Sequence, residues 1–298
     1  MTYESHKPPH AVLRDGFKID EDLPAGKFYT HEDFPDKVVR IERDLPEDDV
    51  YRVPYAKQLL DDLEHRYSIP TVHTQFIIAG KGMPEHLKNT DMPKSIYARY
   101  DLVQVSDRIG NHVSVDDALE EARENAVVAN EFDLLSSKIL RHLEIVLDRG
   151  GVLASEYYHY HQYVFSLSAN EGERLVLVDT EPIHIFALGE PHSRMPGSVP
   201  TGLLTILASC AQDIIRLEKR TGRPSKSRGQ VLNMLAKIDS EGHEEVEVLK
   251  FAIVKAFDEG DSELLDIVHG DFDEGGDELL GEVTKAEISL EEFNQNYR

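Results

Sequence analysis

The run LVLVDTEP at residues 175–182 is the most informative stretch of the chain, because four apolar residues end abruptly on a carboxylate. Four apolar residues in a row predict a buried strand. Asp179 then lies where this strand leaves the core, and Pro182 prevents further strand pairing. A carboxylate in this place can hold a metal ion or polarise a substrate, or it can form a loop turn with its own backbone. Asp179 is therefore the first candidate for a site residue.

The segments around this run alternate between a hairpin and helices. Residues 162–167 and 174–178 flank the turn-forming sequence ANEG, which predicts a β-hairpin. Apolar residues at helical spacing predict further helices on both sides of the hairpin. These helices are expected over residues 115–129, 132–147, 202–219, 228–238 and 244–257.

The first third of the chain is richer in strands. Residues 37–41, 72–79 and 96–105 predict strands, and residues 51–67 carry leucines at helical spacing. We therefore expect an α+β fold with two parts. The first is a small β-rich N-terminal lobe over residues 1–105, and the second is a larger helical C-terminal lobe over residues 106–298 that carries the hairpin with Asp179.

The composition limits the classes of partner. The chain has 56 Asp and Glu against 32 Lys and Arg, which gives a formal net charge of −24. Nucleic acids and anionic membranes are bound largely through Lys and Arg, so neither is expected as a partner. The single cysteine, Cys210, lies in an apolar run, which indicates a core residue rather than a nucleophile. With a polar N-terminus and no apolar run long enough to span a bilayer, the chain is expected to be cytoplasmic.

Four segments resemble the protein-kinase-like superfamily, in particular diverged bacterial kinases and aminoglycoside phosphotransferases. Residues 38–41 resemble the strand that carries the phosphate-binding cation, and the helix with Glu64 resembles helix C. Residues 102–110 resemble the fifth strand and the hinge between the lobes. Residues 162–165, followed by 177–181, resemble the end of the catalytic loop and the metal-binding DFG segment. The resemblance implies a two-lobed kinase-like fold.

The same resemblance implies roles for individual residues around Mg-ATP. Asp179 and Gln162 would hold magnesium, and Glu156, the acidic residue nearest the expected base, would act in catalysis together with Asp179. Arg40 would contact the phosphates, oriented by Glu64, and the backbone from Asp107 to Ile109 would bind the purine. Kinases depend on this positioning and charge neutralisation.

Several positions depart from the family pattern. Arg40 replaces the usual Lys, the glycines at 16 and 26 are isolated rather than part of a GxGxxG loop, and no HRD or HGD triplet precedes Gln162. An HGD triplet at residues 269–271 comes too late in the chain. Two functions therefore remain open, a kinase-like phosphotransferase with an unknown phosphate acceptor, or an inactive pseudokinase that acts as a binding module for a nucleotide or a protein partner.

Two further patterns suggest other metal sites. His159 and His161 are two residues apart and, with Asp179 or His184, could hold a transition metal in a metal-dependent hydrolase. Tyrosines surround them, which favours a packed structural role. The acidic run at residues 271–282 nearly matches a calcium-binding EF-hand loop, although Gly275 occupies a ligand position. Whether it binds calcium stays open.

Overall fold

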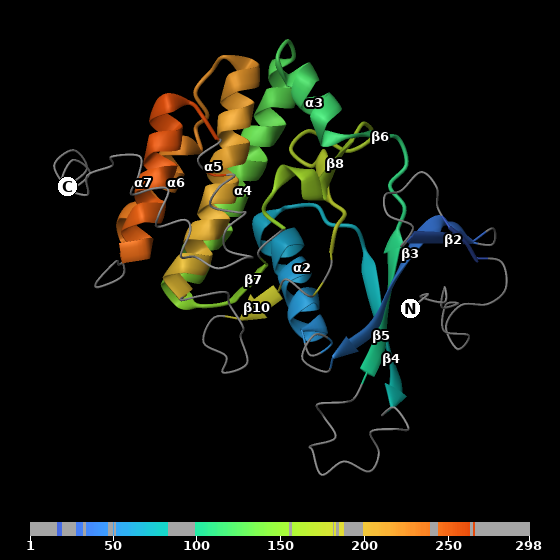
Figure 1. Ribbon diagram of the computed structural model, residues 1–298. Helices are drawn as coiled ribbons and strands as arrows, with labels where there is room; N and C mark the ends of the chain where they lie inside the picture. The colour runs from blue at the N-terminus through green and yellow to red at the C-terminus, as the bar shows by residue number, and fades with distance from the viewer. Residues whose placement is uncertain are drawn as a thin grey trace, which may run out of the picture.

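The computed structural model describes the greater part of the chain (Figure 1). The described residues are 17–19, 28–31, 34–46, 50, 52–82, 99–154, 157–180, 182, 185–187, 199–238, 244–262 and 265.

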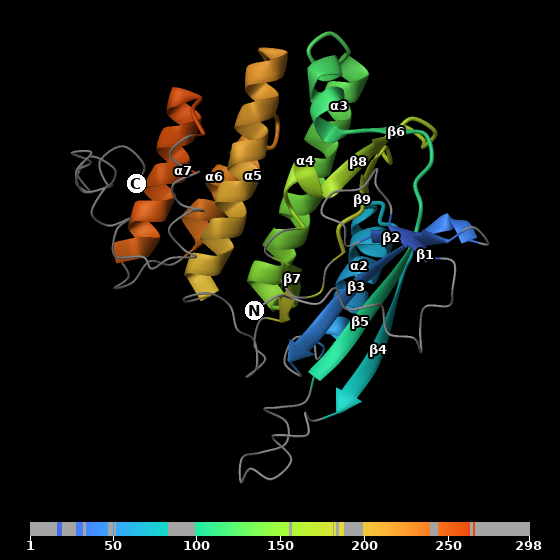
Figure 2. The same ribbon diagram turned by 45° about the vertical axis from the view of Figure 1, so that its right-hand side comes forward.

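A five-stranded antiparallel sheet forms one side of the molecule (Figures 1 and 2). Its strand order is β1-β2-β3-β5-β4, so the strand that follows β4 in the sequence lies between β4 and β3. The strands are β1 (Phe17–Ile19), β2 (Phe28–His31), β3 (Phe34–Pro46), β4 (Thr74–Gly82) and β5 (Arg99–Asp107). The strands expected over 37–41, 72–79 and 96–105 are therefore confirmed, with ends shifted by a few residues.

The two faces of this sheet differ in character. Val39, Ile41 and Val103 are buried together on one face. Side chains alternate along a strand, so Arg40 and its paired residue Gln104 lie on the opposite face. That face is turned toward the rest of the molecule.

Helix α2 (Val53–Tyr67) connects β3 to β4 and packs against the helical part of the chain. Pro54 lies in its first turn, where no intrahelical bond from its nitrogen is required. Ser68, in the left-handed conformation, ends it. Its buried face contacts α4, β7 and β10, and in Figure 1 it stands between the sheet and the long helices.

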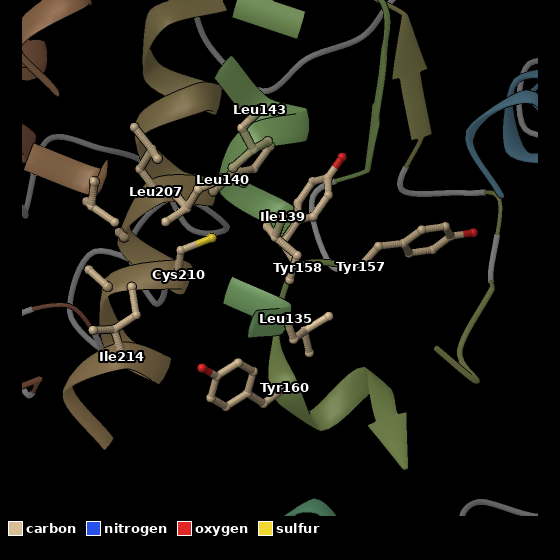
Figure 3. Packing of buried hydrophobic residues seen from close by; sticks show 14 of the residues in the cluster. Leu135, Ile139, Leu140, Leu143, Tyr157, Tyr158, Tyr160, Leu207, Cys210 and Ile214 are labelled. Atoms are coloured by element: carbon tan, nitrogen blue, oxygen red, sulfur yellow. The ribbon is translucent and has the colours of Figure 1, made fainter. Parts of the chain in front are cut away.

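The helical part is built on two long helices that pack against each other. Buried side chains from both fill the space between them, and the thiol of Cys210 lies in this core (Figure 3). Burial raises the pKa of Cys210 far above its usual value, which fits the predicted core role rather than a nucleophile. The two long helices are α4 (Ala126–Arg149) and α5 (Val199–Thr221), and the others are α3 (Val115–Ala122), α6 (Arg228–Lys237) and α7 (Glu244–Glu259).

The predicted hairpin is present and is extended by one further strand. Strands β8 (Tyr163–Ser166) and β9 (Leu175–Leu177) are antiparallel, and β6 (His112–Val113) pairs with β8. A second small sheet pairs β7 (Val152–Ala154) with β10 (Ile185–Ala187), and a short 3-10 helix at Tyr160–Gln162 precedes β8.

One helix boundary differs from the prediction. The break between the helices expected over 115–129 and 132–147 lies earlier, at residues 123–125. The side chain of Asn125 accepts hydrogen bonds from the backbone N–H groups of Val127 and Val128 and starts α4 there. In other respects the fold is a mixed one with a small antiparallel sheet and several helices, compatible with α+β. None of the helices in the described residues combines the length and hydrophobicity that crossing a bilayer requires.

Candidate functional site

A cavity of about 580 Å³ lies between the sheet and the helical part of the chain. Sites for small molecules have volumes of roughly 300–1,000 Å³, so this cavity has the size of a ligand site. Its walls come from β3, β5, the connection after β5, the start of α3 and the ends of β8 and β9. The lining includes Arg40, Gln104, Asp107, Ile109, Gln162 and Asp179.

Arg40 connects the sheet to the segment after β9. Its Nη1 lies 3.1 Å from Oδ1 of Asp179, and its Nε lies 2.7 Å from Oε1 of Glu42. The side chains of Arg40 and Glu42 are only 10% and 14% exposed, whereas Asp179 is 36% exposed and faces the cavity. The sequence predicted both Arg40 and Asp179, but it did not predict that they form an ion pair or that Glu42 shares the arginine.

The connection after β5 is fixed to β3 and to the start of β4. The N–H of Asp107 donates to the carbonyl of His73 at 3.0 Å, and the N–H of Arg108 donates to the carbonyl of Asp36 at 2.7 Å. The carboxylate of Asp107 also pairs with Lys37, and this hydrogen bond raises the pKa of Lys37. Asp107 and Ile109 thus line the cavity from a segment held by main-chain bonds.

Gln162 supports the residue that follows β9. Its carbonyl oxygen accepts hydrogen bonds from the N–H groups of Val178 at 3.0 Å and Asp179 at 3.4 Å. Its side-chain Nε2 lies 2.9 Å from Nε2 of His161. Gln162 is buried and lines the cavity, and its main chain lies next to that of Asp179.

A chain of hydroxyl groups joins the sheet to the same segment. The Oγ1 of Thr74 on β4 lies 2.9 Å from Oγ of Ser106 on β5 and 3.2 Å from Oγ1 of Thr180. Leu177 also bonds through its main chain to Pro70 and Val72, just before β4. These bonds fix the position of Asp179 relative to β5, and no short motif in the sequence announces them.

One of the predicted site residues that the structure describes lies outside the lining of the cavity. Glu64 is exposed on α2 and does not line the cavity, while Arg40 is paired with Glu42 and Asp179. Glu42, two residues along the same strand, pairs with Nε of Arg40. The orientation of Arg40 by Glu64 stays a prediction. Glu156 lies outside the described residues, as does the acidic run at 271–282.

Asp213 is a residue near the site that the sequence analysis missed. It is 1% exposed on α5, and its Oδ2 accepts a hydrogen bond from the N–H of Tyr160 at 2.7 Å. The same oxygen lies 3.7 Å from Nδ1 of His159, and Oδ1 lies 3.9 Å from Arg216. A buried carboxylate therefore anchors the segment that leads to Gln162. A lone Asp within the apolar sequence of α5 was the available signal.

The two histidines of the alternative metal site lie close together. The ring centroids of His159 and His161 are 4.8 Å apart. Within the described residues, however, no group of three or more His, Cys, Asp or Glu side chains is placed to hold a metal ion. His184, the other candidate ligand in that hypothesis, lies outside them. Asp179 is thus not brought into a three-ligand cluster with the pair.

The cavity differs in charge from the chain as a whole. Its lining contains three arginines and three aspartates, in a protein whose formal net charge is −24. The site is therefore much less negative than the average surface, which favours an anionic ligand there over elsewhere on the molecule. The charged lining residues are Arg40, Arg108, Arg216, Asp107, Asp116 and Asp179.

Comparisons with known proteins give little to set beside this geometry. No family model matches the chain, and no curated protein matches it. Among solved structures, it is similar to a chain in a structure of WaaP in complex with acyl carrier protein, with 12% sequence identity and a TM-score of 0.43. That alignment covers 83% of this chain and 90% of the other. A likeness at this level leaves the function to be argued from the site itself.

Proposed function

We propose that the chain is a diverged kinase-like phosphotransferase that binds Mg-ATP in the cavity between two lobes, over residues 1–105 and 106–298. The observation that carries this proposal is the ion pair between Arg40 and Asp179 across the cavity. It places a cation of the third strand next to the carboxylate that follows a hairpin. Kinase chemistry requires this juxtaposition, because a cation and a metal-binding carboxylate must reach the same phosphates.

The arrangement of elements supports the same proposal. The sheet order β1-β2-β3-β5-β4, with a helix between β3 and β4, is what the resemblance to kinases implies for the small lobe. The connection after β5 lines the cavity where a hinge would lie. In this proposal, the main chain from Asp107 to Ile109 binds the purine through groups other than the N–H of Asp107 and Arg108, which bond to His73 and Asp36, and Arg40 contacts the phosphates.

The residues near Asp179 fit a hard divalent cation. Asp179 supplies a partly exposed carboxylate, and Gln162, whose side chain carries an amide oxygen, lines the same cavity. Magnesium prefers oxygen ligands and commonly takes one or two carboxylates together with phosphate oxygens. When bound, the ion would neutralise phosphate charge, while Arg40 and Glu42 hold the position of Asp179 on the side of the sheet. Glu156 remains the proposed base, and the phosphate acceptor is not identified.

An inactive pseudokinase is the second candidate. It is favoured by the same ion pair, because Asp179 already has a cationic partner and must share its carboxylate with a metal ion. A nucleotide would then bind without transfer of its phosphate. An assay for ATP consumption on protein that binds Mg-ATP separates this candidate from the active enzyme.

Thermal unfolding with Mg-ATP, with magnesium alone and with ATP plus EDTA tests the proposal. A ligand present at a hundred times its dissociation constant stabilises the folded state by about 2.7 kcal/mol. For a chain of this size, that corresponds to a rise in the melting temperature of roughly 5–10 °C or less. We expect the rise with Mg-ATP only, and we expect Asp179→Asn to reduce it strongly.

The matched control is Asp61→Asn, which removes an exposed carboxylate of α2 that does not line the cavity. This variant should respond to Mg-ATP as the wild type does. If the wild type shows no rise with Mg-ATP, nucleotide binding is wrong. If Asp179→Asn responds as strongly as the wild type, the metal role of Asp179 is wrong.

A further inference from the structure

Gln104 is a buried residue in β5 whose side-chain nitrogen has no hydrogen-bond partner in the described part of the chain. The residue is only 3% exposed. Buried amide groups are nearly always paired, because an unpaired donor has lost its water without a replacement. An unpaired donor on a residue that lines a cavity therefore suggests a ligand atom as its partner.

The position of Gln104 in the sheet sets it beside Arg40. The two residues face each other across the β3–β5 pair, and both line the cavity. Directly paired residues of antiparallel strands lie on the same face, with Cβ atoms about 4.5–5.5 Å apart. An amide donor and a guanidinium thus lie next to each other on one wall, an arrangement that suits anionic oxygen atoms.

Gln104 lies on the same strand as Asp107, at a distance from the proposed purine site. Asp107 follows three residues later, and a strand rises by about 3.3 Å per residue, which gives roughly 10 Å between the two positions. A purine bound to the main chain from Asp107 to Ile109 would therefore leave Gln104 on the side of the phosphates.

Tyr163 also lines the cavity and has a buried hydroxyl without a partner among the described residues. Its surroundings differ from those of Gln104. Tyr163 is 2% exposed and belongs to the large hydrophobic cluster of the helical part, so its ring is packed in that core. Gln104 is the unpaired group on the face of the sheet that borders the cavity.

We propose that Gln104 is a ligand-positioning residue whose side-chain N–H donates to an oxygen of the phosphate chain, next to Arg40. This inference rests on the proposed function, since it names the part of the nucleotide that this wall binds. It predicts that Gln104 distinguishes ligands by their phosphates rather than by their base.

The test measures the affinities of Mg-ATP, tripolyphosphate with magnesium, and adenosine by calorimetry. Gln104→Met has a similar length and lacks the donor. We expect it to weaken Mg-ATP and tripolyphosphate by about tenfold to a hundredfold, because hydrogen bonds to charged groups have this weight. Adenosine should bind within about twofold of the wild-type affinity, on the same reasoning.

Gln75→Met is the matched control, because Gln75 is exposed on β4 and does not line the cavity. It should leave all three affinities unchanged. Unfolding in urea shows whether Gln104→Met is folded, and Gln104→Glu, which keeps the shape but replaces the donor by a carboxylate, should weaken the phosphate ligands at least as much.

The outcomes separate the inference from the proposed function. If the wild type binds Mg-ATP and Gln104→Met binds it equally well, the inference is wrong and the proposed function stands. If Gln104→Met weakens adenosine as much as Mg-ATP, Gln104 contacts the base and the inference is wrong. If the wild type binds none of the three ligands, the proposed function fails and the inference fails with it.

Discussion

Arg40 is the single residue on which the geometry of the cavity depends most. Its guanidinium holds Glu42 through Nε and Asp179 through Nη1. A planar fork can contact two carboxylates at once, whereas the compact ammonium of a lysine is a single point charge. The departure from the Lys that kinases use therefore has a physical consequence, because the arginine positions Asp179 as well as carrying charge.

Replacement of Arg40 tests this double contact. Arg40→Met leaves two carboxylates without their cation, one of them mostly buried, and we expect a loss of about 2–3 kcal/mol in the free energy of unfolding. Arg40→Lys retains the charge and should lose about 1 kcal/mol. Urea denaturation measures both. Arg141→Met, at an exposed site on α4, is the control, and an equal loss in this variant would contradict the account.

His142 makes the stability of the protein depend on pH. It is 3% exposed on α4, with Nε2 lying 3.1 Å from the hydroxyl of Tyr158, and burial lowers the pKa of His142 from 6.5 to about 4. The folded state therefore keeps the ring neutral, while the unfolded chain takes up a proton below pH 6.5. The stabilisation is complete above about pH 6.5 and is lost as the pH falls toward 4.

The expected loss between pH 6.5 and pH 4 is about 3 kcal/mol, since one pKa unit corresponds to about 1.4 kcal/mol. Carboxylates titrate in the same range, so the measurement is the difference between the wild type and His142→Gln, which keeps an acceptor near Tyr158. Urea denaturation at several pH values gives this difference. A difference that does not change with pH would show that His142 is not neutral in the folded protein as described.

At the scale of elements, helix α4 holds the turn between β8 and β9. Glu131 is 4% exposed and accepts hydrogen bonds from the N–H of Gly172 at 2.6 Å and of Arg174 at 3.4 Å. Lys138, about two turns further along α4, donates to the carbonyls of Gly172 at 2.8 Å and Ser68 at 2.5 Å. The turn, the end of α2 and the hairpin that leads to Asp179 are thus fixed to one helix.

Glu131→Ala should destabilise the protein by about 2–3 kcal/mol, because it leaves two main-chain N–H groups without their acceptor. Hydrogen exchange should become faster at Gly172 and Arg174, while the exposed Glu124→Ala serves as the control. If exchange in the hairpin is unchanged although the overall stability falls, the contact between α4 and the turn does not hold the hairpin.

Elements with strong periodicity could be predicted from the sequence, and those with weak local signals could not. The hairpin on both sides of residues 169–172 and the long helices follow from patterns of apolar residues. The pair β7–β10 was missed, because its strands have three residues each and are about thirty residues apart in the sequence. The start of α4 at Asn125 depends on one side-chain cap, which competed with a continuous apolar pattern.

The candidate site shows the same limit at the scale of the whole molecule. Residue types and nearby strands identified Arg40, Gln162 and Asp179, but Arg40 and Asp179 are 139 residues apart and meet only in the fold. Glu42, Gln104 and Asp213 were missed, since their importance depends on burial and on partners distant in the sequence. Glu64 was named from the resemblance alone; it is exposed on α2, and its role stays a prediction.

For the whole molecule, we expect a nucleotide to occupy the cavity between the sheet and the helices. Photolabelling with an ATP analogue that carries an azide on its purine tests it most directly, followed by identification of the labelled peptide. We predict that the label falls between Ser106 and His112, that it requires magnesium, and that excess Mg-ATP prevents it. Labelling in another part of the chain, or labelling that excess Mg-ATP leaves unchanged, would contradict the account.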